Sequence, residues 1–122
     1  MTIAYWCVLA IIIFPYIFTT LAKWGPEYDN YSRAYLDHLK GWRKRAYWVQ
    51  SNTFEGSPGF MAAVIIAQQL DAVQSSIDNL AIAYILTRII YAICYITDKA
   101  TLRTIFWLLG LGCIISLFVI AA

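Results

Sequence analysis

The sequence predicts an all-α membrane protein in which one domain, residues 1–122, forms a four-transmembrane-helix bundle. The first observation behind this prediction is composition: the 122 residues are 61% hydrophobic and only 13% charged, whereas a soluble domain has roughly 25% charged residues. The second is that the apolar residues gather in runs about as long as a bilayer is thick. The net charge of +2 is too small to suggest a nucleic-acid partner, so membrane lipid is the partner that composition supports.

The first apolar run, about residues 3–21, is uncharged and follows no basic segment, so we expect a retained span rather than a signal peptide. The second apolar run is too short to cross a bilayer by itself. Its uncharged part, Gly56–Leu70, would rise about 22 Å as a helix, less than a hydrocarbon core of ~30 Å. The second span is therefore expected at about residues 45–70, and it carries Asn52 and Glu55 towards the membrane.

The third and fourth spans are expected at about residues 77–96 and 104–122, and the fourth contains no charged residue. In the loop between the first two spans, the segment 30–32 is expected to cap a short helix that runs to Lys40. Gly41 is expected to end that helix, because glycine is the usual residue after a helix C-terminus.

The distribution of basic residues predicts the orientation. Eight lysine and arginine residues lie in the first and third loops: Lys23, Arg33, Lys40, Arg43, Lys44, Arg45, Lys99 and Arg103. The second loop and both terminal segments have none. Cytoplasmic loops are enriched in lysine and arginine. We therefore expect both loops to face the cytoplasm and both termini to lie on the non-cytoplasmic side.

The cysteines and the histidine do not predict a metal site. Cys7, Cys94 and Cys113 all fall in apolar runs, where we expect them to pack as small hydrophobic residues rather than form disulfides. The single histidine, His38, lies in a polar loop, so no pair of histidines could ligate haem between helices.

Arg88 is the most informative single residue, because it lies in the middle of the third span. A guanidinium keeps its charge, and placing it in hydrocarbon costs at least ~2.5–3.5 kcal/mol on insertion scales. Such a residue needs a polar partner inside the protein. Glu55 in the second span is the expected partner, and the two side chains are expected to bound a hollow that opens to the cytoplasm.

Helical spacing gathers further polar residues around this pair. Arg45, Asn52 and Glu55 share one face of the second span, and Arg88, Tyr91 and Tyr95 share one face of the third. Arg103 and Thr104 open the fourth span, where backbone N–H groups are free. The sequence therefore predicts a net positive pocket that suits an anionic ligand with carboxylates or a thiolate.

Each of these residues also has a structural interpretation. Arg88 and Glu55 could form an ion pair that only fixes how the second and third helices dock. Tyr91 and Tyr95 could be packing residues, and Arg103 could be an interfacial anchor. The convergence of polar groups from three helices at one depth favours the functional interpretation.

At these positions the chain resembles the MAPEG family, the membrane-associated proteins in eicosanoid and glutathione metabolism. The resemblance covers about residues 32–107, and the stretch 33–46 is most similar to the bacterial branch. The residues that carry it are Arg45, Ala46, Asn52, Glu55, Pro58, Phe60, Arg88, Tyr95, Arg103 and Thr104. Glutathione-active members tend to have further basic residues in the second helix, where this chain has Trp48 and Ser51.

The resemblance implies a left-handed four-helix protomer, a homotrimer in a bacterial inner membrane, and glutathione as a co-substrate held between protomers on the cytoplasmic side. It implies a transferase or peroxidase that acts on lipophilic electrophiles, with Arg103 or Thr104 stabilising the thiolate. The ligand contacts carried over are Asn52, Glu55, Arg88, Tyr95, Arg103 and Thr104.

Two other functions remain open from the sequence. One is a non-catalytic membrane subunit that stabilises a larger complex or binds lipid, with Glu55 and Arg88 as a docking pair and Trp48 plugging the site. The other is a small proton-coupled efflux protein, although that class usually has its carboxylate in the first helix, and the first helix here is uncharged.

Overall fold

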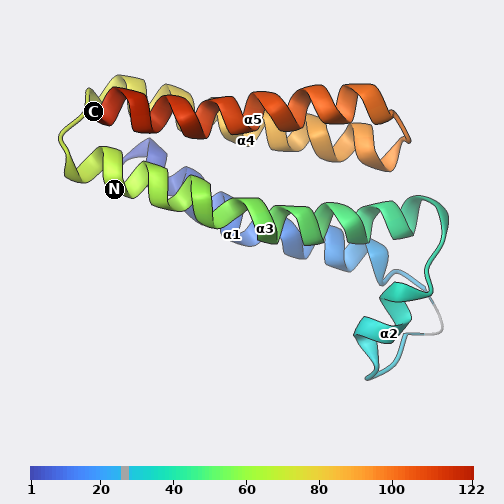
Figure 1. The fold of residues 1–122 in the computed structure, drawn as a ribbon. Coiled ribbons are helices and arrows are strands. Elements are labelled where there is room, and N and C mark those ends of the chain that lie inside the picture. Colours follow the sequence, from blue (N-terminus) through green and yellow to red (C-terminus); the bar gives the residue numbers. More distant parts are fainter. Residues whose placement is uncertain (26–27) are drawn as a thin grey trace.

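Four long helices run side by side along the molecule in the computed structural model, and a fifth, short helix lies beside one end (Figure 1). The structure describes residues 1–25 and 28–122. The helices are α1 (Ile3–Ala22), α2 (Ser32–Asp37), α3 (Gly41–Gln69), α4 (Gln74–Ile96) and α5 (Ala100–Ala121). Within the described residues there is no β-strand, so the all-α prediction is confirmed.

The long helices agree with the predicted runs to within a few residues, but the first loop differs from the prediction. The short helix ends at Asp37 rather than at Lys40, and no side chain caps its first turn. Gly41 does not end that helix; it is the first residue of α3 and has a φ of +67°. Glycine favours this left-handed conformation, which serves equally well to begin a new helix after a sharp change of direction.

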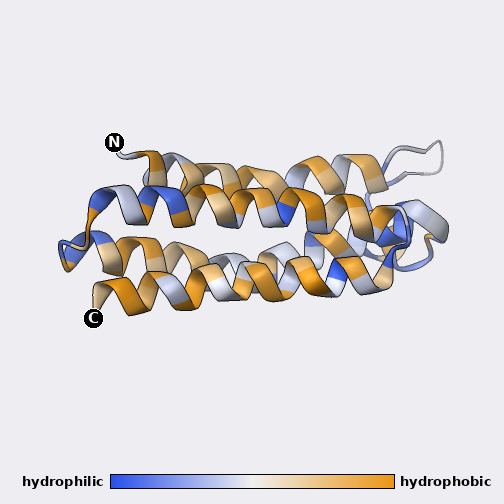
Figure 2. Ribbon diagram, turned by 90° about the horizontal axis from the view of Figure 1, so that it is seen from above, coloured by the Kyte–Doolittle hydropathy of each residue, from blue (hydrophilic) through white to orange (hydrophobic). Residues whose placement is uncertain are grey.

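Among the described residues, α1, α4 and α5 are long and apolar enough to cross a membrane. Helix α3 is longer, at 29 residues, or roughly 43 Å, but it carries many of the polar side chains of the bundle. Hydrophobic residues cover most of the long helices, and hydrophilic residues gather at the connections at both ends (Figure 2). The protein is therefore an all-helical integral membrane protein.

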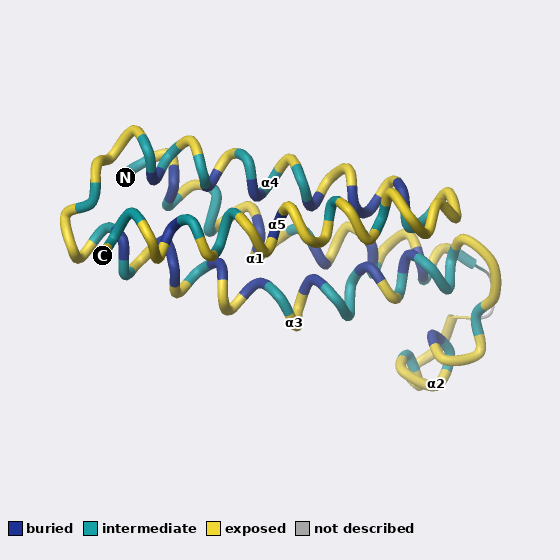
Figure 3. The backbone as a smooth tube through the Cα atoms, turned by 45° about the horizontal axis from the view of Figure 1, so that its top comes forward, coloured by how far each residue is buried: buried dark blue, intermediate teal, exposed yellow. Residues whose placement is uncertain are grey.

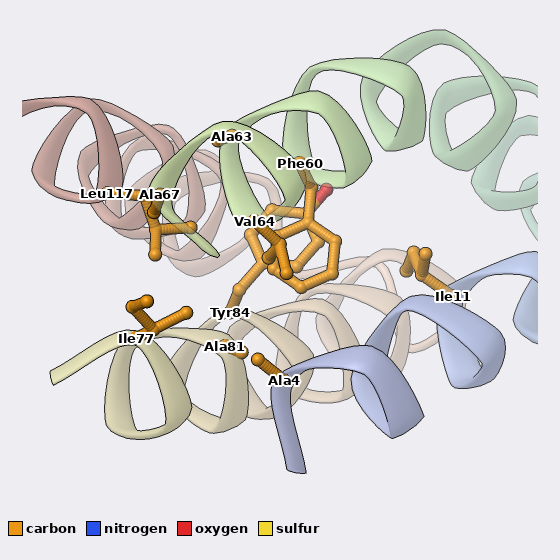
Figure 4. Packing of buried hydrophobic residues seen from close by; sticks show 10 residues of the cluster. All are labelled: Ala4, Ile11, Phe60, Ala63, Val64, Ala67, Ile77, Ala81, Tyr84 and Leu117. Atoms are coloured by element: carbon orange, nitrogen blue, oxygen red, sulfur yellow. The ribbon is translucent and has the colours of Figure 1, made fainter. Parts of the chain in front are cut away.

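The packing is centred on α3 and α4, each of which contacts both α1 and α5. Buried residues lie on the sides of the helices that face one another, while the outer sides are exposed (Figure 3). At the centre, the rings of Phe60 and Tyr84 stack 4.1 Å apart and nearly parallel. Ile11 of α1 and Leu117 of α5 lie around these rings (Figure 4). In lipid, such close van der Waals packing is what holds helices together.

Three consecutive basic residues at the start of α3 bind the C-terminal ends of three other helices. Arg43 Nε donates to the carbonyl of Ala22 at 3.1 Å, and Arg45 Nε donates to that of Ile96 at 3.1 Å. Lys44 Nζ donates to the last carbonyls of α2 at 2.7 and 3.2 Å. Cations at helix C-termini complement the helix dipole. The same residues that indicate topology in the sequence therefore join α1, α2 and α4 to α3.

At the opposite end, Asp78 of α4 caps α1. Its Oδ1 accepts the backbone N–H of Ala4 at 2.9 Å and the side-chain amide of Gln74 at 2.8 Å. Gln74 exchanges hydrogen bonds with Gln68 of α3, which also bonds Thr2. Three helices are thus connected at the end that holds both termini (Figure 1).

The close packing of α4 on α5 depends on Gly110, and this gives a testable prediction. A methyl carbon at Gly110 would lie 3.1 Å from Thr87 Oγ1 and 3.6 Å from the Tyr84 ring. We expect Gly110→Leu to push the two helices apart and to lower the free energy of unfolding by about 1–3 kcal/mol. Gly112 is the matched control in the same helix, because no atom lies within 4 Å of a methyl carbon there.

Unfolding of both variants in mixed detergent micelles, followed by circular dichroism, measures the difference. Gly112→Leu should be neutral or slightly stabilising, since glycine costs roughly 0.5–1 kcal/mol in a helix interior. Equal stability of the two variants would contradict the close α4–α5 contact.

Candidate functional site

A cavity of about 480 Å³ lies between α3, α4 and α5, in the half of the bundle where α3 and α5 begin. Its volume is within the usual range of small-molecule sites, roughly 300–1,000 Å³. The lining residues are Trp48, Ser51, Asn52, Glu55, Tyr91, Tyr95, Arg103, Thr104 and Trp107. Most of the side chains predicted for the site are therefore brought together; Arg45 and Arg88 are the two that lie outside this cavity.

Arg88 lies behind the cavity, and its side chain is only 3% exposed. One Nη atom donates to Asn52 Oδ1 and to Thr53 Oγ1, both at 2.9 Å. Thr53 Oγ1 in turn donates to the carbonyl of Val49 at 2.8 Å. Arg88 also borders a second cavity of about 60 Å³ together with Trp107, and its buried Nε has no hydrogen-bond partner among the described residues.

The predicted ion pair between Arg88 and Glu55 is wrong. The amide of Asn52 and the hydroxyl of Thr53 hold the guanidinium instead. Glu55 is exposed and lies on the wall of the large cavity, about one turn further along α3. A carboxylate that faces an open cavity keeps its solvation, which a buried contact with Arg88 would remove.

A column of aromatic rings and guanidinium groups forms the α4 side of the site. The Arg88 guanidinium lies 4.2 Å from the centre of the Tyr91 ring, and Tyr91 meets Tyr95 edge-to-face at 5.7 Å. The Arg103 guanidinium lies 4.5 Å from the centre of the Tyr95 ring. The predicted alignment of Arg88, Tyr91 and Tyr95 is confirmed, and each end of the column has a cation over a ring face, which is an attractive arrangement.

Arg45 is placed next to the site rather than in it. Its Nε–H is used by the carbonyl of Ile96 at the end of α4. The side chain lines a cavity of about 120 Å³ that also has Trp48, Tyr95 and Arg103 in its wall. These three residues line the 480 Å³ cavity as well, so the two spaces adjoin.

Thr104 and Arg103 differ in what they can donate to a ligand. Thr104 Oγ1 donates its proton to the carbonyl of Ala100 at 3.1 Å, within α5. A hydroxyl has a single proton to donate, so in this arrangement Thr104 can act towards the cavity only as an acceptor. Arg103 therefore supplies the strong donors on the α5 side.

Three residues that line the cavity were not predicted as ligand contacts: Trp107, Trp48 and Ser51. Trp107 follows Arg103 by four residues and Trp48 precedes Asn52 by four, so helical spacing could have placed both on the site face. Thr53 was missed because its contact with Arg88 depends on how α3 and α4 are aligned. Trp48 does not plug the site: it lies on the wall, 6.2 Å from the Tyr95 ring, and is 45% exposed.

The cavity has opposite charges on different helices. Arg103 of α5 is the cation in its wall, and Glu55 of α3 is the carboxylate. The amide of Asn52 and the hydroxyl groups of the tyrosines can bond neutral polar groups. The arrangement suits a small zwitterionic ligand with one ammonium group and at least one anionic group. No group of three or more metal-ligating side chains occurs in the described parts of the chain.

Comparison with known proteins identified a protein family. The sequence model of the MAPEG family matches residues 3–122. Neither the curated proteins nor the solved structures contain a match to this chain.

Proposed function

Because the chain belongs to the MAPEG family, we propose that it is a membrane-embedded, glutathione-dependent transferase or peroxidase that acts on lipophilic electrophiles. The observation that carries this proposal is the cavity between α3, α4 and α5, which has Glu55 and Arg103 in its wall. Glutathione has an ammonium group, two carboxylates and a thiol, so it can use both charges. Family membership supports this ligand class.

In this proposal all four long helices cross the membrane. Helices α1 and α4 both run from the end that holds the chain termini to the other end (Figure 1). Helix α3 follows α1 and precedes α4 in the sequence, and it runs in the opposite direction. It therefore has to cross the membrane if α1 and α4 do. The basic residues at the start of α3 and α5 then face the cytoplasm, and the termini face out. The similarity of residues 33–46 to the bacterial branch supports a bacterial inner membrane.

We also propose a homotrimer, in which a neighbouring protomer completes the site. Helix α5 supports this arrangement, because its buried residues are Gly110 and Leu117 and the rest of its surface is largely exposed. Glu55 and Thr104 line the cavity yet are exposed. A second protomer against this side would cover the exposed apolar residues and enclose the ligand.

Each polar side chain has a proposed role that follows from its chemistry. Glu55 accepts hydrogen bonds from the ligand's ammonium group, and Asn52 bonds a peptide group. Arg88 positions Asn52, to which it donates a hydrogen bond of 2.9 Å. Tyr95 is a further donor beside Arg103. Trp48 and Ser51 supply no positive charge, so fewer charged contacts to the carboxylates are available than in members with basic residues there.

Arg103 is the residue that we assign to the chemical step. Its guanidinium stabilises the ligand sulfur as a thiolate, which is the reactive nucleophile. In conjugation, the thiolate forms a bond to the electrophilic carbon, the leaving group departs with the bonding electron pair, and the thiol proton goes to solvent. In peroxide reduction, two thiols are oxidised to one disulfide while the peroxide is reduced to an alcohol and water.

A conjugation assay on the purified wild-type protein tests the proposal. With glutathione and 1-chloro-2,4-dinitrobenzene in detergent micelles, we expect a rate that rises with protein concentration above the rate in empty micelles. Rates equal to those of empty micelles, both with this electrophile and in glutathione-dependent reduction of a lipid hydroperoxide, would contradict the proposed function. Stoichiometric co-purification of another membrane protein in that case would favour the non-catalytic subunit.

A further inference from the structure

A separate cavity of about 400 Å³ lies where α3 begins, next to the turn between α4 and α5. Lys40, Lys44 and Arg45 are in its wall, together with Asp98 and the indole of Trp48. Three cations against one carboxylate give this cavity a net positive charge. It shares only Trp48 with the cavity that we assign to the thiol.

The cations retain donors for a ligand. Lys44 uses two of its three ammonium protons for the carbonyls of Leu36 and Asp37. Arg45 uses its Nε–H for Ile96, and within the described residues no acceptor takes its terminal NH₂ groups. Lys40 is exposed and makes no hydrogen bond with its side chain in the described part of the chain. These groups can together bind a phosphate oxygen at short range.

The depth of this cavity follows from the helices that end beside it. Helix α1 has 20 residues, about 30 Å, which matches the hydrocarbon core of a bilayer. Its last residue, Ala22, is bound by Arg43, and the end of α4 at Ile96 is bound by Arg45. The cavity therefore lies just beyond the hydrocarbon, at the level of the lipid headgroups. Trp48 at its rim is 45% exposed, as interfacial aromatic residues are.

We propose that this cavity binds the phosphate of an anionic phospholipid from the same leaflet. Phosphate is also available as a soluble ion, but the headgroup level and the exposed indole favour the lipid. A lipid there would contact Trp48 and so lie next to the thiol site. The site is independent of the proposed enzymatic function, because its cations lie outside the 480 Å³ cavity.

Tryptophan quenching in vesicles tests this proposal with the full chain. The protein is reconstituted in phosphatidylcholine vesicles that contain either brominated phosphatidylglycerol or brominated phosphatidylcholine at the same mole fraction. We expect stronger quenching by the anionic lipid, and Trp48→Phe should remove most of that difference. Lys40→Gln should weaken the preference for the anionic lipid about tenfold or more, as expected for the loss of one charge-assisted hydrogen bond to the phosphate.

Arg33→Gln is the charge-matched control, because Arg33 is exposed on α2 and does not line the cavity. It should leave the preference unchanged. If Lys40→Gln and Arg33→Gln reduced the preference for the anionic lipid equally, the attraction would be a diffuse property of the basic surface. The proposed phosphate site would then be wrong. Millimolar inorganic phosphate at matched ionic strength should not relieve the quenching; if it does, the site takes soluble phosphate and the lipid assignment is wrong.

Discussion

Replacing Arg88 with alanine is expected to lower the free energy of unfolding by about 2–4 kcal/mol. The change removes the hydrogen bonds that join α4 to Asn52 and Thr53 of α3, both 2.9 Å long. It also enlarges the 60 Å³ cavity that Arg88 borders. Because the guanidinium is costly to bury, part of this loss is offset by the relief of desolvation.

Arg88→Met separates the loss of volume from the loss of hydrogen bonds. Methionine fills most of the space, the Thr53 hydroxyl still donates to Val49, and Asn52 can bond water in the cavity. We therefore expect methionine to cost less than about 1.5 kcal/mol. Unfolding in mixed micelles measures both variants. If both variants were as stable as the wild type, the hydrogen bonds and the volume of Arg88 would not contribute to stability. If Arg88→Met lowered the free energy of unfolding as much as Arg88→Ala, the separation of volume from hydrogen bonding would be wrong.

Arg103→Ala is expected to lower kcat/KM for glutathione conjugation by about 10²–10³-fold. The guanidinium is the cation in the cavity wall. The hydroxyl of the neighbouring Thr104 already donates its hydrogen bond to the carbonyl of Ala100. Loss of Arg103 therefore leaves the developing thiolate without a strong donor from α5. Arg103→Lys should recover part of the rate, because lysine keeps the charge but not the guanidinium that lies over the Tyr95 ring.

Lys99→Ala is the control for this experiment. Lys99 is a basic residue that precedes α5, about one turn before Arg103, and it lines the adjoining 120 Å³ cavity but not the large one. It should change the rate little. If Lys99→Ala and Arg103→Ala had equal effects, the rate would depend on general positive charge near the site. If Arg103→Ala were fully active, the assigned role of Arg103 would be wrong.

The helices could be predicted from the sequence because hydrophobic runs and bilayer thickness constrain them strongly. Because the uncharged run is shorter than a bilayer, the start of α3 was correctly predicted upstream of it, within a few residues of Gly41. The expectation that Gly41 ends the short helix was wrong, because a glycine suited to a left-handed turn can follow one helix or open the next. Gly41 does the second.

The side-chain partners were harder to predict. Helical spacing placed Tyr91, Tyr95 and Arg88 on one face, which the structure confirms. The partner of Arg88 depends on how far α3 is shifted along α4. That axial shift cannot be predicted from a single sequence. A shift of one turn decides between Glu55 and Asn52. The basic residues 43–45 were interpreted only as an indication of topology. Their second role, which is to bind the carbonyl groups at helix C-termini, was not predicted.

Calorimetric titration of glutathione into the solubilised protein is the most direct test of the thiol site. We expect saturable binding to the wild type, and we expect Glu55→Gln to weaken it about ten- to hundredfold through the lost contact with the ammonium group. Asp98→Asn, which removes a carboxylate outside the large cavity, should bind like the wild type. Absence of saturable heat in the wild type, or equal affinities of wild type and Glu55→Gln, would contradict a glutathione site between α3, α4 and α5.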